Sequence, residues 1–251
     1  MLNEQQKNLY LRNILVAEIG EIGQEKLLSA KILVIGAGGL GSATLQYLAC
    51  GGVGNIAVID HDIVELSNLQ RQIIHNFSDL GTAKIESAKN KIKLLAPEIN
   101  FMAIQQKANH ENLTKFVKDF DIVVDCTDNF ASRFLINLVC FEQKKPLIFG
   151  AVKGFSGQLA VFNSYQKNQP CYACFNHNDE NIELPLADKG ILGAVAGSIG
   201  SMMAIYTIKE ILNLNNDLKN FDGTKIMFFD FLKNNFRITK LKKNFSCKVC
   251  S

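Results

Sequence analysis

A glycine-rich segment directly follows a short apolar run, and this combination could bind a nucleotide phosphate. Residues 31–35 have strand composition, and Gly36, Gly38 and Gly41 then fit the spacing G-x-G-x-x-G. The first glycine permits a tight turn, the second lets backbone N–H groups approach a phosphate, and the third lets helix and strand pack closely. The amphipathic segment that follows predicts a helix whose N-terminus faces the phosphate.

An acidic residue closes the next apolar run. Residues 56–60 end in Asp60, 19 residues after Gly41. That spacing places a carboxylate where the ribose hydroxyl of a bound nucleotide lies. A glycine-rich turn alone would equally suit a bend without a ligand. Strand, turn, helix, strand and terminal acid in this order indicate a nucleotide, but not which one.

Charged and hydrogen-bonding side chains follow at the sheet edge where ligands bind in parallel α/β proteins. The polar segment 60–72 contains Arg71, Lys84 opens the next predicted helix, and the segment 125–129 ends another predicted strand with Asp128. Each charge alone suits a solvated surface. Together, two cations and an acid that can hold magnesium suit attack on a phosphate, because they stabilise charge on the transferred and leaving groups.

Hydride transfer is the alternative chemistry for such a fold. A dehydrogenase needs a proton donor near the nicotinamide, and the sequence shows no orienting partner for either His61 or His75, the histidines near this edge. It also contains no Tyr-x-x-x-Lys segment. An NAD(P)-binding oxidoreductase is therefore the weaker interpretation. A non-catalytic scaffold of the same fold is disfavoured because all the motif charges are present.

The seven cysteines divide into two groups. A polar N-terminal segment predicts no export signal, which argues against a disulfide framework. One C-x-x-C pair alone could be a redox pair, but two pairs can supply four thiolates to one tetrahedral ion, which predicts structural zinc. The remaining cysteines are predicted to be packing residues. The two pairs are Cys171/Cys174 and Cys247/Cys250, and the others are Cys50, Cys126 and Cys140.

Composition narrows the class of protein. Of the 251 residues, 47% are apolar and 20% charged, as in ordinary globular proteins, and a net charge of +3 is too small to argue for a nucleic-acid partner. Residues 191–208 form an 18-residue run without charge, which is long enough to span a membrane. Its glycines, including the G-x-x-x-G pair Gly193 and Gly197, and its polar flanks instead predict a buried core helix. We expect a cytoplasmic protein without a membrane partner.

The predicted elements alternate between strand and helix in the first 150 residues, which implies a parallel sheet covered on both faces. Two helical pieces, broken near Gly20 and Gly23, precede this pattern, and antiparallel strands and a cysteine-containing loop follow it. We therefore expect one domain over 1–251, with a nucleotide-binding half over 1–150, and a Rossmann-like, mostly parallel α/β sheet extended by antiparallel strands. The predicted strands cover 31–36, 55–60, 100–105, 121–125, 146–151, 156–163, 225–231 and 235–241, and the helices 40–50, 81–95, 111–118, 130–143 and 191–213.

These motifs together resemble the ThiF/MoeB/HesA group, the bacterial relatives of the ubiquitin-activating enzymes. The resemblance extends from Tyr10 and Arg12 to the last C-x-x-C pair, and it is carried by the glycine segment 36–41, the segment 60–72, Lys84 and the segment 125–129. It implies a homodimer that uses ATP, Mg²⁺ and Zn²⁺ to adenylate the C-terminal glycine of a small ubiquitin-like sulfur carrier. The nucleophile is a carboxylate that is already ionised at pH 7, which explains a site poor in catalytic histidine.

Matched by motif, the resemblance also implies individual roles. Asp60 would bind the ATP ribose, Arg71 and Lys84 the phosphates, and Asp128 the magnesium, while Arg12 would reach into the partner's site. The carrier is of the thiamine type (ThiS) or the molybdopterin type (MoaD), and the segment 154–159 slightly favours thiamine biosynthesis. The implied nucleotide site comprises Gly36, Gly38, Gly39, Gly41, Asp60, Asp62, Asn68, Gln70, Arg71, Lys84, Asp128 and Asn129, and the catalytic residues are Arg12, Arg71, Lys84 and Asp128.

One departure from the family concerns sulfur transfer. Many relatives carry a cysteine a few residues before Gly190, whereas this chain has Leu186 at the aligned position and no cysteine between residues 175 and 190. A covalent carrier–enzyme intermediate needs such a nucleophile. We therefore expect a separate sulfur donor.

Overall fold

Continuous apolar runs build the centre of the sheet. Three of its strands are buried along almost their whole length, without the alternation of a half-exposed strand. This pattern is typical of parallel strands covered by helices on both faces. The computed structural model describes residues 1–176, 190–214 and 223–251. Its central strands are β1 (Lys31–Ile35), β2 (Asn55–Asp60) and β4 (Ile122–Asp125), flanked by β3 (Asn100–Gln105) and β5 (Leu147–Lys153).

The strand order confirms the predicted α/β architecture. One eight-stranded sheet has the order β3-β2-β1-β4-β5-β6-β7-β8; its first five strands are parallel and the rest antiparallel. The strands that follow β1 in the chain lie first on one side of it (β2 and β3) and then on the other (β4 and β5). In open α/β sheets, ligands bind at such a switch point, outside the carboxyl ends of the strands. The antiparallel strands are β6 (Ser156–Phe162), β7 (Lys225–Asp230) and β8 (Asn235–Lys240).

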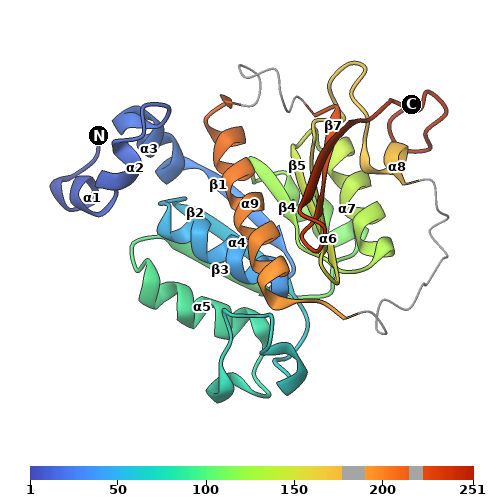
Figure 1. Cartoon of the computed structure of the whole chain (residues 1–251). Helices are drawn as coiled ribbons and strands as arrows, with labels where there is room; N and C mark the ends of the chain where they lie inside the picture. Colours follow the sequence, from blue (N-terminus) through green and yellow to red (C-terminus); the bar gives the residue numbers. More distant parts are fainter. Residues whose placement is uncertain (177–189, 215–222) are drawn as a thin grey trace.

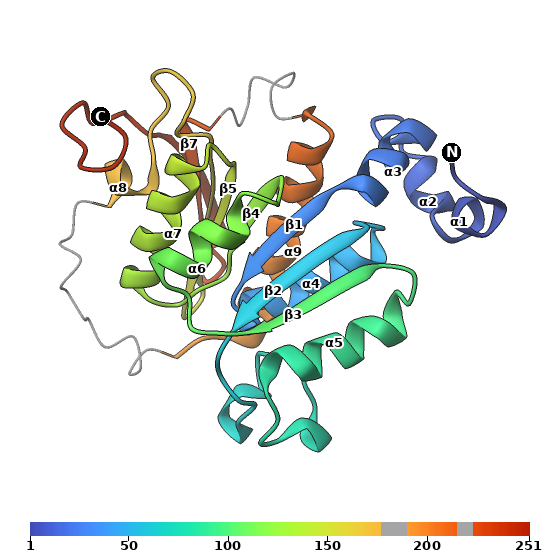
Figure 2. The same ribbon diagram turned by 180° about the vertical axis from the view of Figure 1, so that it is seen from behind.

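Helices cover both faces of the sheet (Figures 1 and 2). An apolar core lies between each face and its helices. Alternate residues of β1 divide between them: Ile32 and Val34 pack into the first core, and Leu33 and Ile35 into the second. Both faces of the central sheet are therefore buried under apolar side chains. The first face is covered by α4 (Gly39–Cys50), α5 (Lys84–Leu95) and α9 (Gly193–Ile211), and the second by α6 (His110–Val117) and α7 (Phe130–Glu142).

The N-terminal region differs from its prediction. It forms three helices where two pieces are expected, and the expected break is present just before Gly20 but absent at Gly23: α1 (Glu4–Leu9), α2 (Leu11–Ile14) and α3 (Gly20–Ser29). Gly20, at φ +58°, begins α3 rather than interrupting a helix. Gly23 lies inside α3, where a Cβ would come within 3.2 Å of side-chain atoms of Ile19 and Leu212. This glycine therefore serves packing, not a break.

The apolar run at 191–208 forms most of α9, whose buried face packs on α4 in the first core. The expected G-x-x-x-G packing is wrong in detail, because Gly197 faces open space. Close approach instead uses Gly193, whose Cβ would meet the Gln70 carbonyl oxygen, and Gly200, whose Cβ would meet the Leu40 carbonyl oxygen. Within the described ranges, the structure contains no helix with the length and apolarity that a membrane crossing needs.

Short helices appear where the sequence predicts loops. One turn of helix, α8 (Tyr172–Phe175), begins directly after Cys171 and contains Cys174, the other cysteine of that C-x-x-C pair. Two 3₁₀ turns, η1 (Leu66–Asn68) and η2 (Phe77–Asp79), shape the polar segment between β2 and α5. Residues 177–189, which include Leu186, lie outside the described residues.

Candidate active site

A cavity of about 1830 Å³ opens at the carboxyl ends of the parallel strands. Its inner end is formed by the glycine turn after β1 and the polar segments after β2 and β4, and its outer end by the antiparallel strands and α8. The sheet topology thus brings together segments that are far apart in the sequence. Among the predicted site residues, those that line the cavity are Gly36, Gly38, Gly39, Asp60, Asp62, Gln70, Arg71, Lys84, Asp128 and Asn129.

Gly36 and Gly41, the first and last glycines of the motif, have no room for a side chain. Gly36 adopts φ +99°, and a Cβ on it would lie 2.9 Å from the Cys126 carbonyl oxygen. A Cβ on Gly41 would clash with the Gly36 carbonyl oxygen, so this glycine permits close packing of α4 against the turn. Gly38 is the N-cap of α4. The first N–H groups of a helix have no partner within it, so this end of α4 can bind an anion.

Asp60 lies at the end of β2 with only 9% of its surface exposed. Its Oδ2 accepts a hydrogen bond from the Ala37 N–H at 2.7 Å, and its Oδ1 accepts one from the Asp62 N–H at 2.9 Å. The carboxylate therefore braces the glycine turn. A carboxylate oxygen has more than one lone pair, so Asp60 can also accept a hydrogen bond from a ligand in the cavity.

The two cations differ in their surroundings. Lys84 is 6% exposed, and its Nζ lies 2.8 Å from Asp62 Oδ2. Burial raises the pKa of the Asp62 carboxyl, but the hydrogen bond and charge of Lys84 outweigh it, so the net shift is downward. Arg71 is half-buried and donates from Nη1 to the Ser67 carbonyl at 3.0 Å. Both cations can face a polyphosphate, with Lys84 held in place by Asp62.

Asp128 and Asn129 follow β4 at the opposite wall of the inner end. The Asp128 carboxylate is exposed to the cavity, and Asn129 Nδ2 lies 3.5 Å from it. Asn129 is also the N-cap of α7, because its Oδ1 accepts the Ser132 N–H at 2.9 Å. An exposed carboxylate on a fixed helix start can hold a hard cation such as magnesium.

Three residues of the predicted nucleotide and catalytic site lie outside the lining. Within the described part of the chain, Gly41 packs behind the turn, and Asn68 is a buried cap whose Oδ1 accepts the Glu65 N–H at 3.1 Å. Arg12 is exposed on α2 and does not line this chain's cavity. Asn68 therefore stabilises the backbone of the segment after β2, and Arg12 lies at the surface, where it can contact another molecule.

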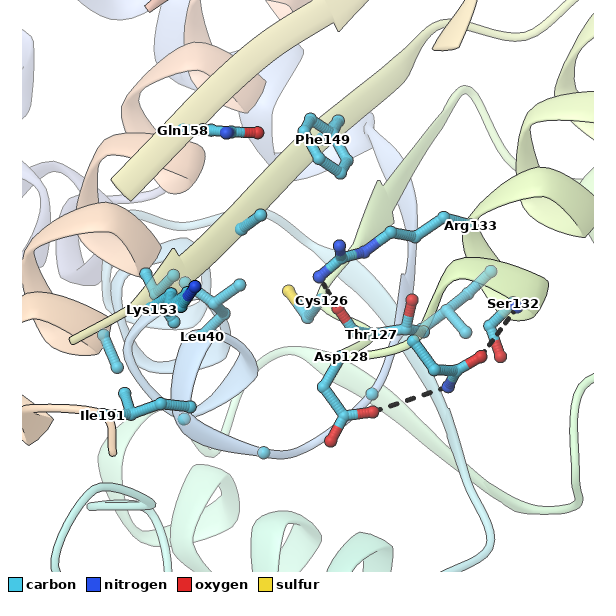
Figure 3. Close-up of a pocket in the computed structure, with 18 of the residues that line it drawn as sticks. Leu40, Cys126, Thr127, Asp128, Ser132, Arg133, Phe149, Lys153, Gln158 and Ile191 are labelled. Carbon is cyan, nitrogen blue, oxygen red and sulfur yellow. Dashed lines mark hydrogen bonds between the residues drawn. The ribbon is translucent and has the colours of Figure 1, made fainter. Parts of the chain in front are cut away.

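The structure adds Arg133, which the sequence did not single out. It is 8% exposed, donates from Nη2 to the Thr127 carbonyl at 2.9 Å, and lies 5.4 Å from the Phe149 ring centre (Figure 3). The buried Asp125 carboxyl lies in its field, but burial dominates and raises the pKa of Asp125. Arg133 comes four residues after the N-cap Asn129. This spacing places Arg133 one turn into α7, and it is the sequence signal from which a role for Arg133 near Asp128 could have been predicted.

Four buried cysteines form a separate cluster beside the outer end of the cavity. The sulfur atoms of Cys171 and Cys247 are 3.6 Å apart, and those of Cys174 and Cys250 are 3.4 Å apart. All four offer ligand atoms within 4.8 Å of one another. A tetrahedral ion with Zn–S bonds of about 2.3 Å sets its sulfurs about 3.8 Å apart, so this cluster fits zinc. The Asn244 N–H also donates to the Cys174 sulfur at 3.3 Å.

The other cysteines only partly match their predicted packing role. Cys126 and Cys140 are buried, and burial raises the pKa of both thiols far above the ordinary value. Cys126 lines the cavity, but such a thiol is a poor nucleophile. For Cys50 the packing prediction is wrong, because it is exposed at the last residue of α4, the helix end that faces away from the glycine turn.

A model of the ThiF family matches residues 10–249. The chain belongs to the ThiF family. One curated relative, the adenylyltransferase and sulfurtransferase MOCS3 of Culex quinquefasciatus, is 40% identical over 253 residues, which cover 100% of this chain and 56% of that protein. The chain thus spans little more than half the length of that relative. The molybdopterin-synthase adenylyltransferase of Escherichia coli strain K12 is 36% identical over 249 residues, 99% of this chain and 98% of that protein.

Solved structures of the same fold support this membership. The crystal structure of E. coli MccB with AMPCPP and MccA superposes with a TM-score of 0.83 at 25% identity, covering 97% of this chain and 74% of that one.

Proposed function

We propose that this chain is an adenylyltransferase that activates the C-terminal carboxylate of a small ubiquitin-like sulfur carrier. The observation that carries the proposal is the convergence of the glycine turn, Arg71, Lys84 and Asp128 on one cavity in a chain of the ThiF family. The names of the E. coli and Culex relatives, both adenylyltransferases, support it.

The proposed reaction needs charge stabilisation more than proton transfer. A carrier carboxylate oxygen forms a bond to the α-phosphorus of ATP, and the bond from that phosphorus to its bridging oxygen breaks to release pyrophosphate. The carboxylate is ionised at neutral pH, so no base is required. The α4 N-terminus, Arg71 and Lys84 would stabilise negative charge on the phosphates as it develops.

Two metals accompany the proposal. Asp128 would hold Mg²⁺, which when bound neutralises charge on the polyphosphate. The cysteine cluster would hold one structural Zn²⁺, since all four sulfurs lie within 4.8 Å of one another. Asp60 would accept a ribose hydroxyl while it continues to brace the turn.

The molybdopterin-type carrier is the first to test, because the E. coli relative carries that name. The thiamine-type carrier, slightly favoured by segment 154–159, is the second. Sulfur would come from a separate donor, because Cys126 is buried with a raised pKa and Cys50 is at the far end of α4. Mass spectrometry of turnover mixtures should then detect no reducible carrier–enzyme adduct on these cysteines.

We further propose a cytoplasmic homodimer in which Arg12 completes the partner's site. Mixing inactive Arg12→Ala and Asp128→Ala chains should restore about a quarter of wild-type activity, because half of the random dimers of a two-fold symmetric protein hold one intact composite site. No recovery despite proven subunit exchange would leave Arg12 acting within its own chain or not at all.

ATP–pyrophosphate exchange with each candidate carrier tests the proposed function. Exchange should require the carrier and disappear with a carrier that lacks its C-terminal glycine. NAD(P)H should not compete with ATP. Tight NAD(P)H binding without exchange would favour an oxidoreductase, and binding of neither nucleotide would favour a scaffold.

A further inference from the structure

The peptide groups of Ala37, in the middle of the glycine turn, are held from both sides by buried side chains. The Ala37 N–H donates to Asp60, and the Ala37 carbonyl oxygen lies 3.0 Å from His75 Nε2. Ala37 is fully buried and His75 is 5% exposed. In the described part of the chain His75 does not line the cavity, so it can act on a ligand only through the turn.

His75 is itself held by residues from two other elements. Its Nδ1 lies 2.8 Å from Ser87 Oγ on α5, and Ser87 Oγ lies 2.9 Å from Asp79 Oδ2 in η2. The expectation that His75 lacks an orienting partner is therefore wrong. Ser87 and Asp79 supply it, and their chain of contacts joins α5 and η2 to the glycine turn.

The carbonyl partner determines the tautomer. A carbonyl oxygen only accepts hydrogen bonds, so His75 Nε2 must carry the hydrogen. In the neutral ring, Nδ1 is then an acceptor, and the one hydroxyl hydrogen of Ser87 is directed either to Nδ1 or to Asp79 Oδ2, both of which can accept it. Burial is the main influence and lowers the pKa of His75, and Lys84 lowers it further, while the Ala37 contact, Asp79 and Asp60 oppose the shift. The neutral ring is thus favoured at pH 7.

The contact to Ala37 is independent of the protonation state. If the ring gains a proton, Nδ1 becomes a donor, and the Ser87 hydroxyl can turn to donate to Asp79. Nε2–H still donates to the Ala37 carbonyl in either state. A group that must hold one geometry over a range of pH benefits from this arrangement.

We propose that His75 is a positioning residue for nucleotide binding: its Nε2–H holds the Ala37 carbonyl away from the cavity so that the N–H groups at the start of α4 face the polyphosphate. Asp60 holds the same peptide segment from the N–H side. Without His75, the Ala37 carbonyl can rotate. The turn then adopts several conformations, and only one of them presents the N–H groups to an anion. The inference rests on the proposed function only in taking ATP as the ligand.

Two amide substitutions of His75 distinguish the roles of its two ring nitrogens. Gln places its Nε2 close to the position of His Nε2, whereas Asn reaches only the position of Nδ1. We expect His75→Gln to keep the dissociation constant for a non-hydrolysable ATP analogue within about threefold of wild type. We expect His75→Asn, which loses the donor to Ala37, to raise it about tenfold.

The measurements are calorimetric titration without carrier, and KM and kcat in pyrophosphate exchange. In the Asn variant, KM for ATP should rise while KM for the carrier stays unchanged. Ser87→Ala, which removes the support at Nδ1 but not the donor, should raise the dissociation constant two- to fourfold and serves if His75 variants fold poorly. Equal dissociation constants for the Gln and Asn variants, or an unchanged constant for Ser87→Ala, would overturn the role of His75.

This design separates the inference from the proposed function. If wild-type protein binds the ATP analogue but shows no exchange with any carrier, the proposed function fails, and the Gln–Asn comparison of binding still decides the role of His75. If wild-type protein does not bind the analogue, both fail.

Discussion

The inner and outer ends of the cavity are built in different ways. At the inner end, the turn after β1 and the segments after β2 and β4 meet because parallel strands end at one edge, and backbone hydrogen bonds such as Ala37 to Asp60 fix them. At the outer end, α8 is held by cysteines from two distant segments. The inner end is thus a product of the sheet itself, whereas the outer end depends on closing a long stretch of chain.

Helix α7 connects the two ends. Near its start, Arg133 donates to the Thr127 carbonyl beside Asp128. One turn later, the buried Asn137 accepts the Tyr172 N–H through its Oδ1 at 2.9 Å, next to Cys171. The ring centre of Tyr172 lies 5.0 Å from that of Phe149, which lines the cavity. The comparison therefore raises a testable question: whether damage at one end is felt at the other.

The largest effect is expected at the inner end. Arg71→Ala and Lys84→Ala should each lower carrier-dependent pyrophosphate exchange about 10²-fold or more, as loss of a charge partner in the transition state typically does. Lys89→Ala is a matched control, because Lys89 lies on the exposed side of α5 beside Glu86. Near-normal exchange in both folded variants would remove these cations from the mechanism.

Metal removal tests the outer end. The protein should contain about one zinc per chain, and Cys174→Ser or Cys247→Ser should release it. Loss of a structural metal should lower the free energy of unfolding by about 3 kcal/mol or more, and Tm by about 6 °C or more.

In these variants, affinity for an ATP analogue should stay within about threefold, because the inner end is fixed by the sheet. Cys50→Ser, at an exposed position, is the control and should retain the metal. Protein prepared without chelators that proves free of metal by elemental analysis would contradict the zinc assignment.

Asn137→Ala tests the connection through α7. It leaves the buried Tyr172 N–H without an acceptor, which should lower the free energy of unfolding by about 1–3 kcal/mol in urea titrations. If the two ends are independent, ATP affinity should change less than about twofold. A tenfold loss of ATP affinity with the metal retained would show that α7 transmits the disturbance.

The smallest effect concerns the Lys84–Asp62 pair. The folded-state pKa of Asp62 is lowered, so its contribution to stability is present above the ordinary carboxyl pKa and is lost as pH falls through the folded value. Because Asp62 is half exposed, this amounts to less than about 1 kcal/mol.

Asp62→Asn should therefore flatten the pH dependence of the free energy of unfolding below about pH 4, measured against Asp119→Asn, an exposed carboxylate after α6. Indistinguishable curves for wild type and Asp62→Asn would show that the pair contributes nothing to folding.

Local signals predicted much of the fold. The strands and helices from residue 31 to 153 lie close to their predicted ranges, because apolar runs, glycines and the cap Asn129 act over a few residues. The N-terminal region was predicted to be helical but with two pieces rather than three, and α8 was missed, because packing between distant segments decides these details. A glycine such as Gly23 suggests a break in a helix. Here it instead allows close packing against Leu212, a residue nearly two hundred positions later in the chain.

The sequence by itself determined the parts of the site that depend on short spacing: the glycine turn with its helix, the acids at strand ends, and each C-x-x-C pair. Only the tertiary structure decided which of these meet. His75 contacts Ser87, Arg133 lies over Phe149, and the sulfur of Cys171 lies close to that of Cys247. Strand order and helix packing bring these segments together. Spacing along the chain constrains neighbours within a few turns, whereas contacts between distant segments depend on how the whole sheet closes.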